Sequence, residues 1–149
     1  KGETNTFRKS LLEIMAAHRV PYAATASVAY PMDFLNKVDK AKRCRGCRVL
    51  HVMAPCPTGW GYDPARTVEL GKLAVESGLW YLAEYENDEL RLTYRPKAFA
   101  SVEEYLKNQR RFRHLKAGDV EEISKLRDAE WRRLDRLFYA RESIPCVYK

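Results

Sequence analysis

Four cysteines are the residues whose types and spacing could support chemistry in this sequence, and Cys56 is the most informative of them. It lies in the run Ala54-Pro55-Cys56-Pro57-Thr58-Gly59-Trp60, directly after an apolar stretch at 49–53 that predicts a buried strand. A thiol at the carboxyl end of such a strand lies where open α/β sheets bind ligands. The alternative, a small core residue, is the usual role of a free cysteine and stays open at this point.

Cys44 and Cys47 form a second candidate, because their CxxC spacing occurs in zinc sites, iron–sulfur sites and redox disulfides. Neighbouring arginines would favour thiolates there. Ordinary free thiols are the competing interpretation, and we expect Cys146, near the end of the sequence, to be incidental. A tetrathiolate site built from all four cysteines also stays open. Together with the basic helices, it would make the chain a non-enzymatic metal- or nucleic-acid-binding module.

Composition narrows the class of protein. With 149 residues, 46% of them hydrophobic, the chain fits one domain with a real core. No apolar run approaches the roughly 20 residues that cross a membrane. The first residues lack the apolar core of a signal peptide, so we expect a cytoplasmic protein. The net charge of +7 favours an acidic partner: nucleic acid, an acidic protein or an anionic cofactor. Basic segments such as 127–133 nevertheless contain acids, which is typical of solvated helix faces.

Familiar catalytic motifs do not occur in the sequence. There is no glycine-rich phosphate loop and no HExxH motif. His18, His51 and His114 lie far apart, and nothing in the sequence joins any of them to a nucleophile. We expect each histidine to be structural.

The spacing of apolar residues predicts the elements that position Cys56. A helix is expected over 6–18, a strand over 20–27 and a second helix from Pro31. A third helix is expected over 63–78, between an aspartate N-cap and a glycine stop. With the strand at 49–53, this alternation of helices and strands is typical of crossover connections and a parallel sheet.

The pattern changes after residue 78. Segments 80–85 and 89–94 flank an Asn87-Asp88 turn and predict a hairpin. Capping boxes at Ser101 and Asp119 predict two further helices. The small residues at 24–27 either line a ligand crevice or allow close helix packing, and we assign them no catalytic role.

The loop around Cys56 resembles one in the beta subunit of pyruvate synthase, a 2-oxoacid:ferredoxin oxidoreductase. Other segments are similar to that family in the same order and with similar spacing. They cover nearly the whole chain and comprise residues 17–27, 30–34, 73–80, 101–106 and 109–115.

The resemblance covers only the carboxyl-terminal half of that subunit. It implies that residues 1–96 form the second half of an α/β thiamine-diphosphate-binding-type domain, with a partial parallel sheet and a β-hairpin. Residues 97–149 would form a helical extension packed on it. In the family, the amino-terminal half carries three cysteines of a [4Fe-4S] cluster and the motif for Mg²⁺ and thiamine diphosphate. The resemblance therefore implies a fragment, one product of a split subunit, or the ordered remainder of a longer chain.

The family's fourth cluster ligand matches Cys56 alone, and an iron–sulfur cluster requires thiolates held in place. The pair Cys44 and Cys47 departs from the family, which has no cysteine pair in that turn. We expect Cys56 to be a metal ligand; no catalytic or cofactor-binding residue is assigned.

The activity implied by the resemblance is CoA-dependent oxidative decarboxylation of pyruvate, or the reverse carboxylation. Oxalate, aryl or branched-chain 2-oxoacids are alternative substrates. The implied cofactors are a [4Fe-4S] cluster, thiamine diphosphate and Mg²⁺, the last two held mainly by residues outside this chain. The expected partners are other subunits or the amino-terminal half, ferredoxin, a 2-oxoacid and coenzyme A, without nucleic acid or membrane.

Overall fold

The computed structural model describes residues 9–139 of the chain. Its elements follow in the order α1 (Leu11–Ala17), β1 (Tyr22–Ser27), α2 (Pro31–Arg43), β2 (Arg48–Met53), α3 (Pro57–Trp60), η1 (Pro64–Arg66), α4 (Thr67–Glu76), β3 (Leu82–Glu86), β4 (Glu89–Tyr94), α5 (Val102–Lys107), η2 (Arg110–Phe112) and α6 (Ala117–Tyr139). The predicted α/β class, the hairpin and the helices that follow it are confirmed. Among the described helices, none combines the length and the apolar character needed to cross a membrane.

The described strands form one mixed sheet in the order β2-β1-β3-β4. β1 and β2 are parallel, with Tyr22 opposite Arg48, as their crossover through α2 requires. β3 runs antiparallel to both β1 and β4. The hairpin turn has positive φ angles at Asn87 and Asp88, which suits a two-residue turn between strands.

The apolar strand before Cys56 lies at an edge of this sheet. The prediction of a buried strand at 49–53 is therefore wrong except at Met53, because the other residues of β2 are half-buried or exposed. Within the described residues β2 pairs on one side only, with β1. β1, by contrast, has a neighbour on each side and is buried at all six positions.

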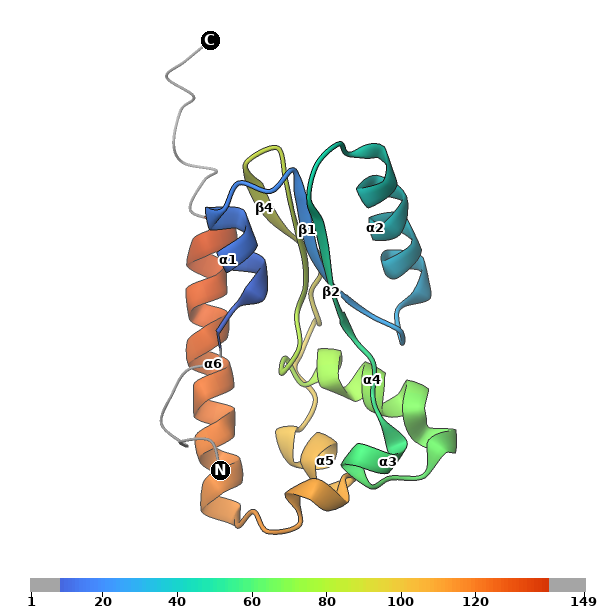
Figure 1. Cartoon of the computed structure of the whole chain (residues 1–149). Helices are drawn as coiled ribbons and strands as arrows, with labels where there is room; N and C mark the ends of the chain where they lie inside the picture. Colours follow the sequence, from blue (N-terminus) through green and yellow to red (C-terminus); the bar gives the residue numbers. More distant parts are fainter. Residues whose placement is uncertain (1–8, 140–149) are drawn as a thin grey trace.

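Helices cover both faces of the sheet (Figure 1). α1 and α6 lie on one face and α2 lies on the other. Trp131 and Leu134 of α6 pack with Leu12 of α1 against Ala23 of β1. Tyr22 and Ala24 point to the opposite face and pack with Ala41 of α2. This follows from the alternation of side chains along a strand.

A third group of buried residues lies at the end of the sheet where β2 stops. Met53 packs there with Leu70 of α4, Trp80, and Leu106 of α5. The Trp80 indole N–H donates to the carbonyl of Ala26 at 3.0 Å. Gly78 ends the preceding helix as predicted, with a left-handed φ of +74°. The sheet, α4 and α5 therefore share one core beside the loop that carries Cys56.

Two helix starts differ from the predictions. α1 begins at Leu11, because the Ser10 hydroxyl accepts from the N–H of Glu13 and caps the helix there. Phe7, predicted to lie in this helix, is outside the described residues. α6 begins at Ala117, ahead of the predicted cap. The Asp119 carboxylate reaches back to the N–H of Lys116 at 2.7 Å, so it acts from inside the first turn.

Candidate functional site

Cys56 lies in a loop fixed by its own local geometry. β2 ends at Met53, Pro55 is buried, and Cys56 is the N-cap of α3. Its side chain is exposed, and its Sγ accepts a hydrogen bond from the N–H of Gly59 at 3.4 Å. The small-core alternative for this residue is therefore wrong. Hydrogen bonds to ligand sulfurs are a recurrent feature of iron–sulfur sites, so the loop suits one cluster thiolate.

The structure does not bring the cysteines of the described residues together. Cys44 ends α2 and is half-buried, and Cys47 is exposed in the turn before β2. Cys56 follows the other end of β2, and a six-residue strand spans about 20 Å. Figure 1 shows the α2–β2 turn and α3 at opposite ends of that strand. Cys44 and Cys47 therefore cannot share one metal ion with Cys56, and Cys146 lies outside the described residues.

Among the side chains of residues 9–139, only Cys56 is placed to act as a ligand of the implied cluster. In these residues no group of three or more His, Cys, Asp or Glu side chains is arranged to hold a metal ion. A [4Fe-4S] cluster takes four thiolates. Cys56 fits the chemistry of one of them, and the other three must come from outside the described residues.

The α3 helix beside Cys56 packs against η2, a basic segment more than fifty positions later. The Arg111 guanidinium lies 3.8 Å from the centre of the Trp60 ring and 4.4 Å from that of Phe112. The N–H of Arg110 donates to the carbonyl of Gly61 at 3.1 Å. Gly61 has a left-handed φ of +71°, and a Cβ there would meet the Arg110 Cβ at 2.8 Å. Only glycine allows this close approach.

The small residues at 24–27 belong to the core. Ser27 is fully buried, and a Cβ at Gly71 of α4 would be in van der Waals contact with its hydroxyl oxygen, at 3.7 Å. The Thr25 hydroxyl donates to the carbonyl of Tyr81 at 2.7 Å and accepts from the N–H of Ala83 at 3.0 Å. These hydroxyls serve the packing of the sheet, which favours the close-packing interpretation.

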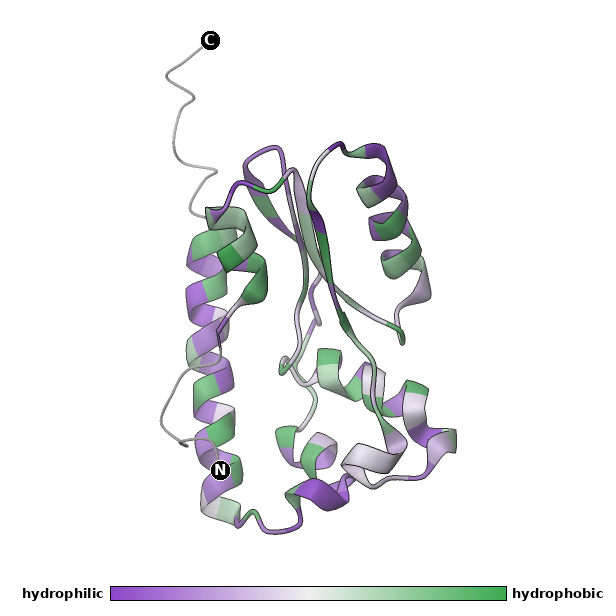
Figure 2. Cartoon of the chain, viewed as in Figure 1, coloured by the Kyte–Doolittle hydropathy of each residue, from purple (hydrophilic) through white to green (hydrophobic). Residues whose placement is uncertain are grey.

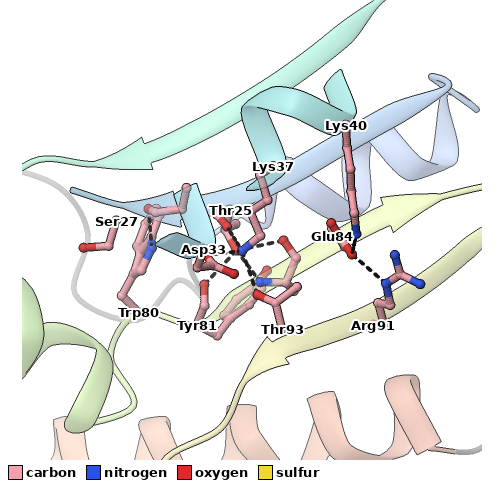
Figure 3. A network of polar contacts seen from close by, with 12 residues as sticks. Thr25, Ser27, Asp33, Lys37, Lys40, Trp80, Tyr81, Glu84, Arg91 and Thr93 are labelled. Atoms are coloured by element: carbon pink, nitrogen blue, oxygen red, sulfur yellow. Dashed lines mark hydrogen bonds and ion pairs between the residues drawn. The ribbon is translucent and has the colours of Figure 1, made fainter. Parts of the chain in front are cut away.

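Sequence reasoning missed a polar network between α2 and the sheet (Figure 3). The buried Lys37 ammonium donates to the Thr25 carbonyl at 2.8 Å, to Asp33 at 2.6 Å and to the Thr93 hydroxyl at 2.7 Å. Burial lowers the pKa of Lys37, although the Asp33 carboxylate opposes this shift. Three partners satisfy the ammonium fully, so this lysine has a structural role rather than that of an available base.

Glu84 is the second centre of this network and is almost fully buried. Its carboxylate accepts from Lys40 and Arg91, each at 2.6 Å, and from the Tyr22 hydroxyl at 2.8 Å. Burial alone would raise the pKa of Glu84, but these hydrogen bonds outweigh it and lower the pKa. An acidic residue inside the apolar run 80–85 was the one sequence signal for this site.

Curated proteins similar to this chain include subunits of two oxidoreductases. Pyruvate synthase subunit PorB of Methanothermobacter thermautotrophicus is 58% identical over 108 residues, which cover 72% of this chain and 38% of that protein. PorB of Methanocaldococcus jannaschii is 50% identical over 81% of this chain and 41% of its own length. Ketoisovalerate oxidoreductase subunit VorB of Pyrococcus abyssi is 43% identical over 87% of this chain and 42% of that protein.

No family model matches the chain. The chain spans about two fifths of the length of the curated relatives that it matches. The resemblance to these subunits is nevertheless confirmed, because identities of 46–58% to PorB subunits extend over most of the chain. The chain belongs to the PorB and VorB family of 2-oxoacid oxidoreductase subunits, as a segment corresponding to part of such a subunit.

Proposed function

We propose that this chain is part of a cytoplasmic pyruvate:ferredoxin oxidoreductase in which Cys56 supplies one thiolate to a [4Fe-4S] cluster. The exposed Sγ of Cys56 at the end of β2 carries this proposal. The similarity to PorB subunits supports the enzyme class, and the free thiols suit a reducing compartment.

Pyruvate is the substrate that the relatives favour. The PorB subunits are 44–58% identical to this chain, and the VorB subunits are 41–43% identical. The reaction would be oxidative decarboxylation with coenzyme A, or the reverse carboxylation. Branched-chain, aryl and oxalate substrates are the alternatives within the same class.

This chain contributes a fixed ligand position in the proposed enzyme. The [4Fe-4S] cluster would supply one-electron transfer. Thiamine diphosphate with Mg²⁺, held mainly by residues outside this chain, would supply the carbanion chemistry. The Gly59 N–H orients the Cys56 sulfur, and Pro55 and Pro57 hold the loop on each side of it. A ligand distant in sequence from the other three also joins two parts of the subunit. Residues 97–149 would form the helical extension of the domain at 1–96.

The Cys56→Ser variant tests the ligand assignment in the enzyme assembled with all its subunits. Serine keeps the size of the side chain and an acceptor for Gly59, but it is a poor ligand for this cluster. We expect the iron and acid-labile sulfide contents to fall by the amount in one [4Fe-4S] cluster. We also expect pyruvate-dependent reduction of ferredoxin to be lost.

Cys47→Ser is the matched control, because Cys47 is an equally exposed thiol at the opposite end of β2. It should keep its full iron content and its activity. Full iron content in Cys56→Ser would contradict the ligand assignment. Loss of iron in Cys47→Ser instead would favour the alternative module built on the CxxC pair.

A further inference from the structure

A hollow of about 570 Å³ lies directly beside the Cys56 loop. It is lined by Thr58, Gly59, Trp60, Gly61, Arg110, Arg111, Arg113 and His114. The helix α3 forms one wall and the segment from η2 to His114 forms the other. Figure 2 shows this second wall as strongly hydrophilic, between α5 and the start of α6. The hollow is open to solvent along much of its surface.

The positive charge of this hollow is not neutralised within residues 9–139. None of the ion pairs of the described residues includes Arg110, Arg111 or Arg113. Some arginines elsewhere on the surface are paired, as Arg43 is with Asp39 and Arg95 is with Asp135, whereas others, such as Arg132 and Arg136, are outside the described ion pairs. Three guanidinium groups on one concave surface make its electrostatic potential positive, which favours the binding of an anion there.

The walls of the hollow are held in place before any ligand arrives. Arg111 is stacked on Trp60, and its Nε–H donates at 2.9 Å to Gln109, which is itself buried. The main chains of Gly61 and Arg110 are hydrogen-bonded to each other. The Arg111 guanidinium is therefore held in place beforehand and loses little freedom when a ligand binds.

From this geometry we infer that the hollow binds the phosphate or diphosphate group of a small molecule. Guanidinium groups match phosphate oxygens with paired hydrogen bonds, and the Thr58 hydroxyl and His114 imidazole add polar groups at the rim. A concave, predominantly polar surface with three cations suits a compact anion better than an apolar ligand or a flat protein surface. Binding of an anion in this hollow requires neither a cluster at Cys56 nor pyruvate as the substrate, so the inference does not depend on those two proposals.

Equilibrium dialysis with radiolabelled inorganic pyrophosphate tests the site in the assembled protein at constant ionic strength. Saturation with thiamine diphosphate beforehand fills any thiamine-dependent diphosphate site in the other subunits. We expect saturable binding that the double variant Arg110→Gln/Arg113→Gln weakens about tenfold or more. Arg111 is left in place because its stacking on Trp60 shapes the wall.

Arg132→Gln/Arg136→Gln is the matched control, because it removes the same charge from two exposed arginines that are also outside the described ion pairs. Position 132 lies about 22 Å along α6 from the start of that helix. The control should bind pyrophosphate like the unmodified protein. Absence of saturable binding, or an equal loss in both double variants, would overturn the inference.

A parallel titration with ADP distinguishes the two sources of the phosphate group. For the binding that the double variant Arg110→Gln/Arg113→Gln loses, equal affinity for ADP and pyrophosphate assigns the site to the phosphate group itself, and tighter binding of ADP assigns it to a nucleotide. Both results support an anion site. Because the measurement is of binding, an enzyme that fails to oxidise pyruvate still gives a decisive answer.

Discussion

Glu84 shows how one buried charge can join three elements. The carboxylate of this β3 residue accepts hydrogen bonds from β1, α2 and β4, through Tyr22, Lys40 and Arg91. Side chains of Lys40 and Arg91 remain 30% and 50% exposed, so water still reaches their charged ends. A buried carboxylate with this many donors specifies which strands and helix come together.

We predict that Glu84→Gln lowers the free energy of unfolding by about 1–3 kcal/mol at neutral pH, because it weakens three hydrogen bonds at a buried group. The folded-state pKa of Glu84 is lowered, so its contribution is present above the unfolded-state pKa and is lost as the pH falls through the folded-state value. The difference between the two proteins should therefore shrink in acid, below about pH 4. Urea unfolding across a pH series measures this.

Glu86→Gln is the control for this prediction. Among the described residues Glu86 forms an ion pair with Arg91 alone, at 3.2 Å, and its side chain is 26% exposed. Its loss should cost less than about 1 kcal/mol, as for other ion pairs near the surface. Equal losses in the two variants would contradict a special role for Glu84.

What could be predicted at single residues depended on local signals. Cys56 was placed correctly at the end of a strand, because the prolines and the apolar run lie beside it in sequence. Apart from Asp33 and Arg91, the partners of Lys37 and Glu84 lie 12 to 62 positions away, so no local pattern indicates them. The role of Cys56 as a metal ligand stays a prediction.

At the scale of elements, α4 packs against the β1–α2 connection through a glycine. A Cβ at Gly71 would lie 2.7 Å from the Cβ of Ala29, closer than atoms of real side chains approach. Gly118, in the first turn of α6, has nothing within 4 Å of its own Cβ position. Substitution of Gly71 therefore tests the packing of α4, whereas substitution of Gly118 tests helix propensity alone.

We predict that Gly71→Ala destabilises the protein by about 1–3 kcal/mol, because the added methyl group forces α4 away from Ala29. Gly118→Ala should be neutral or stabilising by up to about 1 kcal/mol, since alanine is the better helix former. Thermal or urea unfolding of both variants gives the comparison. A stabilised Gly71→Ala would show that α4 has more room than its contacts indicate.

Elements themselves were predicted better than their boundaries. The hairpin and the helix stop at Gly78 were found because turn residues carry a strong signal. The start of α6 was misplaced because an acidic side chain can cap a helix from its N-cap position or from its third residue. The exposed edge position of β2 could not be predicted, because an apolar run does not reveal which neighbours a strand has.

At the scale of the whole molecule, the net charge of +7 should attract acidic proteins and speed their association with this chain. We predict that electron transfer to an acidic ferredoxin depends on ionic strength in the proposed enzyme. The apparent second-order rate constant should fall several-fold between about 20 and 200 mM salt, because screening shortens the reach of attraction. Methyl viologen, a small cation, should show no such fall. A ferredoxin rate that does not respond to salt would exclude steering by this charge.

The edge strand β2 has a consequence for the chain in solution. Its outer side has no neighbouring strand within the described residues, and the side chains of Val49, Leu50 and Val52 along it are half-buried. Such an edge is a template for pairing with any other extended chain. If nothing covers this edge, we expect the chain to self-associate more strongly as its concentration rises, which light scattering over a concentration series would measure.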